Sequence, residues 1–165
     1  MGSMIRSIAI TFGSEKVLND LKAKHPDREL RVYNALSNQN ELMVLDVSGE
    51  ESVFSSPVEY SVLSHIGNDH WNGFISFITL ELDFDQQKVF DARINKLMGD
   101  ILPDGMKSMY SLHSHNNISE RVLLTTWESS SQFELWKKDS NLLMPSTYKT
   151  TPSFYSHEAD YRAVK

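Results

Sequence analysis

The chain contains no cysteine. This absence excludes disulfide bonds, thiolate metal sites and a cysteine nucleophile, and it agrees with a reducing compartment. The sequence also lacks any apolar run that approaches the roughly 18 residues of a membrane span. The apolar stretch at residues 8–12 is too short for the core of a signal peptide. These absences predict a cytoplasmic protein with no integral membrane contact.

Positive charge is also scarce, with 16 Lys and Arg against 22 Asp and Glu and a net charge of −6. Nucleic-acid-binding domains usually carry a basic face, so we expect no nucleic-acid partner. The sequence has no G-x-S-x-G, P-loop, G-x-G-x-x-G or H-E-x-x-H motif. The hydrolase, kinase, dinucleotide and zincin classes therefore have no support. What is present, 165 residues with 40% hydrophobic content, predicts a globular protein with a substantial core.

The most informative feature is a pair of tryptophans, Trp127 and Trp136, at a predicted junction between a strand and a helix. The segment VLLTTW, residues 122–127, alternates as a half-buried strand does, and the serines at 129–131 can cap a helix. Phe133 and Trp136 then follow at helical spacing and share one face. Two readings stay open at this point. The two indoles are either core residues or a wall for a flat ligand.

The predicted elements occur in nearly the same order twice. In the first half we expect a strand at 5–12, a helix at 15–24, strands at 30–36 and 41–47, and a helix opened by Ser56-Pro57 that carries Tyr60, Leu63 and Ile66. In the second half we expect a strand at 74–82, a helix at 85–98, strands at 106–114 and 121–127, a helix at 131–138 and a strand at 155–164. The first half thus reads β-α-β-β-α and the second β-α-β-β-α-β.

This order predicts an α+β protein of the dimeric α/β-barrel (ferredoxin-like) type, with two βαββαβ-type units in one chain forming an intramolecular pseudo-dimer. We place a degenerate N-terminal unit at residues 1–67 and a C-terminal unit at residues 68–165. Because one chain would supply both units, a monomer is favoured, with a weak dimer left open.

Four segments of the sequence resemble a known family. They are residues 10–26 (ITFGSEKVLNDLKAKHP), 41–67, 102–114 (LPDGMKSMYSLHS) and, the most specific, 122–142 (VLLTTWESSSQFELWKKDSNL). They are similar to the two-unit members of the antibiotic biosynthesis monooxygenase (ABM) superfamily, a group that includes signal transduction protein TRAP and the heme-degrading monooxygenase HmoB. The resemblance implies an ABM domain in the C-terminal unit, monooxygenase activity and heme as the cofactor. It also implies that Trp136 is the catalytic residue that presses on the porphyrin.

Two further residues of the heme-degrading type are missing. The resemblance implies a proximal histidine at position 146, which is Ser146 here, and a distal asparagine at or near Ile78. Tyr148 could replace the histidine as a phenolate ligand of the iron, as tyrosine does in catalase. His113 and His115 face the same side of a strand, but no third ligand with convincing spacing accompanies them, so we expect no metal site.

Three functions remain as alternatives. The first is a heme-degrading monooxygenase-like protein that has lost the usual His and Asn. The second is a non-catalytic, TRAP-like ligand-binding or regulatory and stress protein. The third is a cofactor-free oxygenase that acts on a small aromatic. All three predict a small-molecule partner, heme or an aromatic, and the candidate ligand-binding residues are Trp127, Phe74, Phe77, Ile78, Ser146 and Tyr148.

Overall fold

The structure is a computed structural model that describes residues 7–37, 41–55, 57–117, 119–138 and 155–164. These residues form eight strands and three helices. In chain order they are β1 (Ser7–Gly13), α1 (Glu15–Lys24), β2 (Arg31–Ala35), β3 (Leu42–Asp46), β4 (Val58–Gly67), β5 (Phe74–Glu81), α2 (Phe84–Met98), β6 (Met106–Ser114), β7 (Glu120–Trp127), α3 (Ser130–Lys137) and β8 (Tyr155–Ala163).

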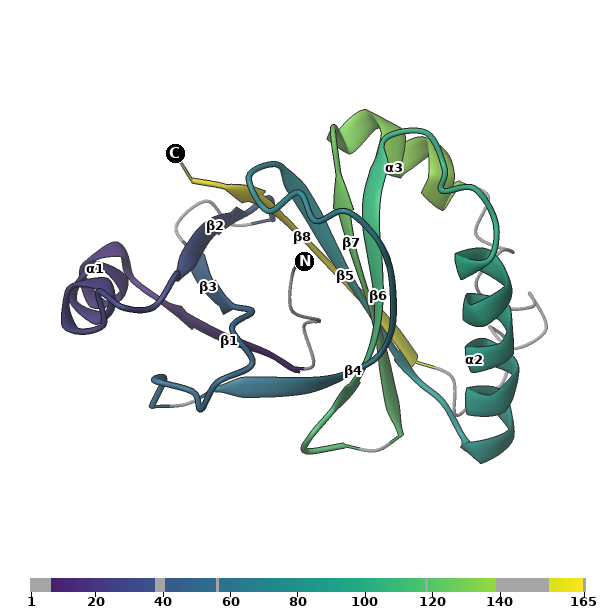
Figure 1. Cartoon of the computed structure of the whole chain (residues 1–165), viewed down its shortest axis with the longest axis horizontal. Coiled ribbons are helices and arrows are strands. Elements are labelled where there is room, and N and C mark those ends of the chain that lie inside the picture. Colours follow the sequence, from purple (N-terminus) through teal and green to yellow (C-terminus); the bar gives the residue numbers. More distant parts are fainter. Residues whose placement is uncertain (1–6, 38–40, 56, 118, 139–154, 165) are drawn as a thin grey trace.

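The strands close into one antiparallel barrel in the order β1-β3-β2-β8-β5-β7-β6-β4. Within each half of the chain, the first strand lies between the fourth and the third, and the second strand follows the third. The halves meet where β2 pairs with β8 and where β4 pairs with β6. Helix α1 covers one side of the barrel, and α2 and α3 lie on the other (Figure 1). This α+β architecture is consistent with two fused ferredoxin-like units.

The predicted helices begin where their caps indicate. Ser14 caps α1 by accepting a hydrogen bond from the Val17 backbone N–H at 3.4 Å. A reciprocal capping box opens α2, in which the Asp83 side chain binds the Gln86 N–H and the Gln86 side chain binds the Asp83 N–H. Helix α3 begins next to its predicted start.

The prediction of a helix at residues 57–67 is wrong. The segment is strand β4, which pairs with β1 on one side and β6 on the other and so completes the barrel. Tyr60 faces the barrel core, and the strand ends at Gly67, whose φ is +95° and whose missing side chain lets it lie against the backbone of Lys107. The segment VEYSV at residues 58–62 also alternates between apolar and polar residues, as a strand does. Hydrogen bonds to two partner strands, β1 and β6, favour the strand over the helix.

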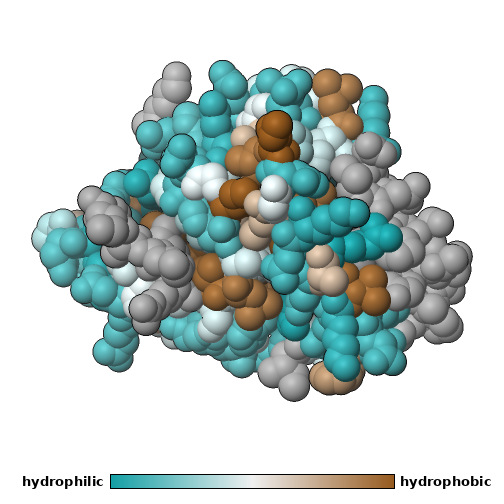
Figure 2. All heavy atoms as spheres, turned by 45° about the vertical axis from the view of Figure 1, so that its right-hand side comes forward, coloured by the Kyte–Doolittle hydropathy of each residue, from teal (hydrophilic) through white to brown (hydrophobic). Residues whose placement is uncertain are grey.

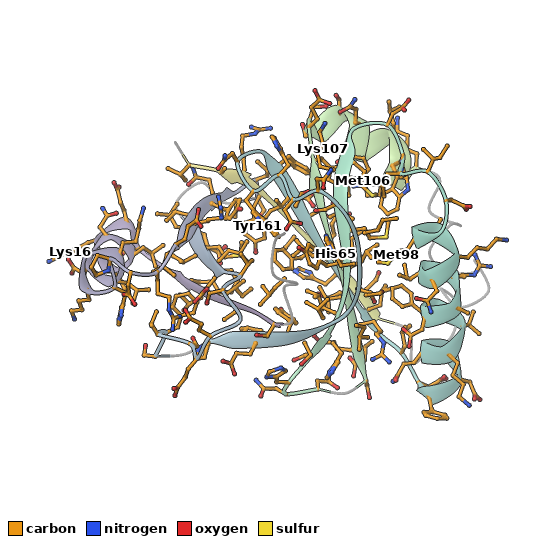
Figure 3. The ribbon with its side chains drawn as sticks, in the orientation of Figure 1. Lys16, His65, Met98, Met106, Lys107 and Tyr161 are labelled. Carbon is orange, nitrogen blue, oxygen red and sulfur yellow. The ribbon has the colours of Figure 1, made fainter. Side chains whose placement is uncertain are left out.

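Buried side chains form three clusters, one inside the barrel and one beneath the helices on each side. The interior cluster includes Tyr33, Tyr110 and Tyr161, and Figure 3 shows Tyr161 within the barrel. A second cluster lies between the outer face of β5 to β7 and helices α2 and α3, and the third lies beneath α1. Met106 belongs to the second cluster and Met98 packs against it. The barrel is therefore a filled core, and its helix-covered outer faces are the places where a ligand can enter.

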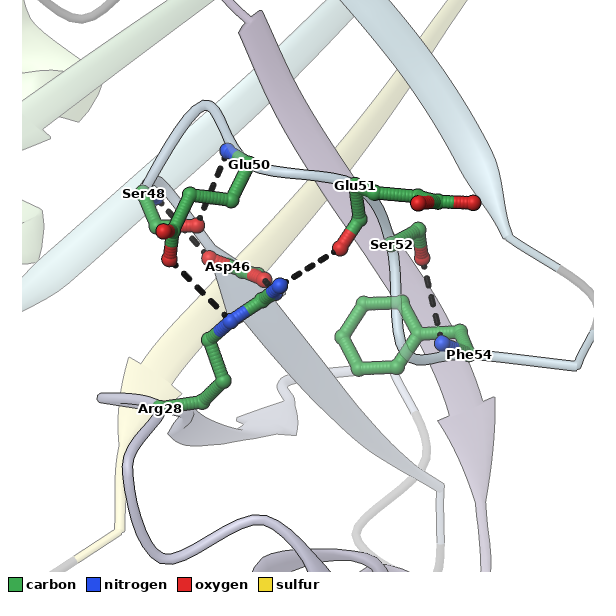
Figure 4. Close-up of polar contacts among 7 residues, drawn as sticks. All are labelled: Arg28, Asp46, Ser48, Glu50, Glu51, Ser52 and Phe54. Atoms are coloured by element: carbon green, nitrogen blue, oxygen red, sulfur yellow. Dashed lines mark hydrogen bonds and ion pairs between the residues drawn. The ribbon is translucent and has the colours of Figure 1, made fainter.

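No helix follows β3 in the first half among the described residues, and a segment held by Arg28 takes its place. The guanidinium of Arg28 contacts the Asp46 carboxylate at 2.8 Å, the Glu51 carbonyl at 2.7 Å and the Glu50 carboxylate at 3.2 Å (Figure 4). The Phe54 side chain, 7% exposed, then packs over the sheet beneath α1. A buried ion pair thus fixes the connection from β3 to β4.

The face that carries α2 and α3 is mostly hydrophilic, with small and separate apolar spots (Figure 2). Its exposed apolar side chains are single residues, such as Phe84 and Leu135, which is usual for a protein surface. Within the described residues, none of the helices has the length and apolar character needed to span a membrane.

Candidate functional site

The two tryptophans lie at one corner, as predicted. Trp127 is the last residue of β7, Trp136 is in α3, and their ring centroids are 5.6 Å apart. Phe133 packs edge-on against Trp127, with ring centroids 5.6 Å apart. Trp127 is fully buried, and its Nε1–H donates to Thr125 Oγ1 at 2.7 Å. Trp136 is 8% exposed, and its Nε1 has no hydrogen-bond partner in the described part of the chain. Trp127 is therefore structural, whereas the donor of Trp136 has no partner among the residues that the structure describes.

The structure brings four of the predicted site residues together on the outer face of the barrel. Phe74 of β5 is the register partner of Trp127, and its ring lies 5.3 Å from that of Phe133. Ile78 lies four residues further along β5 on the same strand face, and it belongs to the same buried cluster as Trp136. The apolar wall thus consists of Phe74, Ile78, Trp127 and Trp136.

The structure does not place Phe77 with them. Phe77 points into the barrel, where it packs edge-on against Tyr161. Successive strand residues point to opposite faces, so Phe74 and Phe77, three positions apart, cannot share a wall. The two other predicted residues, Ser146 and Tyr148, lie outside the described residues.

A row of polar residues crosses the same outer face next to this wall. Ser76 of β5 pairs with Thr125 of β7 on one side and with Asp160 of β8 on the other. Glu158 lies two residues before Asp160, opposite Ile78. Sequence reasoning missed Ser76, Glu158 and Asp160. The alternating polar positions 156, 158, 160 and 162 of the last strand were the available signal.

Burial raises the pKa of the Asp160 carboxyl from 3.8 to about 7. A hydrogen bond that the protonated carboxyl donates to Glu158, and the negative charge of Glu158, act in the same direction, whereas the polar interaction with the Ser76 hydroxyl and the charge of Lys137 oppose the shift. Asp160 Oδ1 and Ser76 Oγ are both buried without a partner in hydrogen-bonding geometry among the described residues. Among the described residues, Trp136 Nε1 is a third buried polar atom beside the apolar wall that lacks a partner in hydrogen-bonding geometry.

A pH-dependent stability follows from Asp160. Because its carboxyl ionises less readily in the folded chain, the folded state binds more protons, and this contribution to stability falls as the pH rises from about 4 to about 7. The substitution Asp160→Asn removes the carboxyl and therefore the free-energy cost of ionising it in the folded chain. Chemical denaturation between pH 4 and 8 should show the variant gaining stability relative to wild type as the pH increases. A difference that is constant with pH would contradict the raised pKa.

Carboxylates of α3 and β8 meet at the edge of the site. Single oxygens of Glu134, Glu158 and Asp160 all lie within 4.8 Å of one another. The Lys137 ammonium already lies 3.2 Å from Glu158 and 3.3 Å from Glu134, and these carboxylates raise the pKa of Lys137 against the effect of burial. Lysine thus occupies the position of a cation, and we assign no metal to the cluster.

The two strand histidines are held by other partners. His115 Nε2 lies 2.8 Å from Ser61 Oγ, its Nδ1 lies 3.7 Å from a Glu59 carboxylate oxygen, and His113 Nδ1 lies 3.2 Å from the Ser114 carbonyl. Their ring centroids are 6.4 Å apart. These contacts account for both side chains at the end of the hairpin.

The described residues of the site do not fit heme in the manner that the family resemblance implies. The charged side chains that α3 and β8 bring together beside the wall are Glu134, Lys137 and Glu158, with the Asp160 carboxyl. Heme carries two propionates, and Lys137, the one cation of this described group, is already paired with both glutamates. This part of the site therefore suits an uncharged planar molecule better than a dianionic one.

No family model matches the sequence. Solved structures share the fold along nearly the whole chain. A major regulator of staphylococcal pathogenesis superposes with a TM-score of 0.78 at 18% identity, over 97% of this chain and 100% of that one. A ferredoxin-fold protein from Listeria monocytogenes, related to antibiotic biosynthesis monooxygenases, gives 0.76 at 20% identity, over 99% and 96%. LmHde, a heme-degrading enzyme from the same species, gives 0.69 at 20% identity, over 95% and 99%. The predicted resemblance to ABM proteins is confirmed as a likeness of fold.

Proposed function

We propose that this chain is an ABM-superfamily protein that binds a planar, uncharged small molecule beside Trp136 and has lost the heme chemistry of its heme-degrading relatives. One observation carries the proposal. The buried polar atoms of Trp136, Ser76 and Asp160 that lack a partner among the described residues belong to the same outer face as an apolar wall, next to carboxylates. Such a wall with a few polar groups is the usual composition of a small-molecule site.

The chemistry of the three polar atoms limits the ligand further. Trp136 Nε1–H can only donate a hydrogen bond, Ser76 can donate or accept, and Asp160 can donate when it is protonated. A ligand carbonyl or hydroxyl oxygen can use all three, and its ring can pack against Trp136 and Ile78. This composition favours the non-catalytic, ligand-binding function over heme degradation.

The arrangement of the chain enters the proposal as well. We infer that residues 1–67 and 68–165 are two ferredoxin-like units that pair as an intramolecular pseudo-dimer. Because the eight described strands already close into a barrel, none of them has an open edge that needs a second chain, and we expect a monomer. We also expect the protein to be cytoplasmic. Light scattering at micromolar concentration would test the oligomeric state.

Heme degradation remains the second candidate, because the family resemblance implies a tryptophan at the position of Trp136 and the fold is shared with LmHde along the chain. Hemin and 1-naphthol, one dianionic and one uncharged planar probe, distinguish the two functions. We expect saturable binding of 1-naphthol, and no loss of the Soret band when hemin, protein and ascorbate are mixed in air. Loss of that band with one-to-one hemin binding would overturn the proposal in favour of heme degradation.

A matched pair of variants locates the binding. Trp136→Phe retains an aromatic ring but removes the Nε1–H donor, and Ser76→Ala removes the unused hydroxyl with little change in volume. Both should weaken 1-naphthol binding. Ser129→Ala, at the half-buried N-cap position of α3, should not. Equal affinity in all three variants would place the ligand elsewhere.

A further inference from the structure

A cavity lies on the side of the molecule opposite to α2 and α3, between α1 and the barrel. It has a volume of about 550 Å³ and is bounded by α1, β2, the segment at 71–72 and the end of β8. We call it the α1 groove. Leu18, Leu30, Val32 and Leu42 supply its apolar surface, and Arg31 is among its polar residues. The volume is within the range of about 300 to 1,000 Å³ that is typical of small-molecule sites.

Backbone contacts hold the far wall of the α1 groove. The Tyr33 hydroxyl donates to the Trp71 carbonyl at 2.7 Å, and the Ala163 N–H donates to the Gly73 carbonyl at 3.1 Å. The Val164 N–H donates to the Val32 carbonyl at 2.9 Å, which ties the end of β8 to β2. The wall is thus preformed, so a ligand would not have to order it.

Arg31 presents an incompletely used guanidinium to the α1 groove. Its Nη2–H donates to Glu29 Oε1 at 2.7 Å, and its Nη1–H reaches Asn72 Oδ1 only at 3.5 Å. Its Nε is enclosed and has no hydrogen-bond partner among the described residues, so a ligand can reach the guanidinium only through Nη1 and Nη2. The Glu29 side chain is 80% exposed, so its ion pair is a weak surface contact that a ligand can replace.

We propose that the α1 groove binds a small amphipathic carboxylate, held by the Nη1 and Nη2 edge of the Arg31 guanidinium. A carboxylate placed along that edge accepts two parallel hydrogen bonds, which a single oxygen of Glu29 does not achieve. The apolar body of the ligand packs on Leu18, Leu30 and Val32. The acidic Glu15 and Glu29 also line the groove and offset Lys22, so one carboxylate is favoured over a polyanion.

This site is independent of the proposed function. Helix α1 and helix α3 lie on opposite sides of the barrel (Figure 1), and none of the residues that line the α1 groove belongs to α2 or α3. Loss of binding at Trp136 would therefore leave the α1 groove unchanged, and the reverse also holds.

Calorimetric titration with sodium octanoate, and with 1-octanol as its uncharged counterpart, tests the proposal on the full chain. We expect saturable binding of octanoate to the wild-type chain. The wild-type chain should bind 1-octanol at least about tenfold more weakly, and Arg31→Met should bind octanoate at least about tenfold more weakly, because both changes remove hydrogen bonds to a charged group. Lys16→Met removes the same charge from α1 at a residue outside the groove lining and should leave the affinity within about twofold. Figure 3 shows Lys16 at the outer side of α1.

Two results would overturn the proposal. One is the absence of saturable octanoate binding to the wild-type chain. The other is an affinity that Arg31→Met leaves unchanged. If Arg31→Met does not fold, Arg31→Lys decides the question, because it retains the charge but lacks the two-donor edge. Weaker octanoate binding to Arg31→Lys supports the proposal, and unchanged binding overturns it.

Discussion

Replacing Trp127 with alanine should lower the free energy of unfolding by about 3 to 5 kcal/mol, the usual cost of truncating a buried tryptophan. Trp127 is fully buried and packs against Phe133 and Trp136 with ring centroids 5.6 Å away in both cases. Its removal would leave a cavity at the junction of β7 and α3 and would leave Thr125 Oγ1 without its donor. Urea denaturation followed by circular dichroism measures the loss.

Two variants separate packing from the hydrogen bond. Trp127→Phe keeps much of the ring contact but loses the Nε1–H, so we expect a smaller loss of about 1 to 3 kcal/mol. Leu135→Ala on the outer face of α3, where the side chain is 68% exposed, should change stability by less than about 0.5 kcal/mol. If Trp127→Ala cost as little as Leu135→Ala, the aromatic corner could not be part of the core.

Replacing Arg28 with methionine should also lower the free energy of unfolding by about 3 to 5 kcal/mol, because it leaves the buried Asp46 carboxylate without its cation. The side chains of Arg28 and Asp46 are only 11% and 2% exposed, and their contact is 2.8 Å long. The same guanidinium holds the Glu51 carbonyl and hence the segment that leads to Phe54. Thermal and urea denaturation would both report the change.

Glu50 provides the matched control for Arg28. Its carboxylate contacts the same guanidinium at 3.2 Å, but its side chain is 67% exposed. Glu50→Gln should therefore cost less than about 1 kcal/mol, as exposed ion pairs do. An equal cost for Glu50→Gln and Arg28→Met would show that burial does not govern the strength of this network.

Local sequence signals were sufficient for most elements and for part of the site. The expected ranges 15–24, 85–98 and 121–127 each place an element within one or two residues of its position in the structure. These signals act between near neighbours, and tertiary contacts reinforce them. The pairing of Trp127 with Trp136 followed from the same local spacing.

Residues 57–67 show where local signals failed. Tyr60, Leu63 and Ile66 fit a helical face, while Val58, Tyr60 and Val62 fit a strand face. Both periods occur in the same few residues, so the sequence does not choose between them. The choice depended on β1 and β6, which offer hydrogen bonds on both sides of β4.

The sequence by itself determined the element types in most segments and the strand-to-helix corner with its two indoles. Only the tertiary structure decided that β4 is a strand, that Phe77 faces the barrel, and that Asp160 lies beside Ser76. The physical reason is the range of the interactions. Caps and periodicity act over a few residues, whereas Ser76 and Asp160 meet through strand pairing between distant segments, whose register no local pattern specifies.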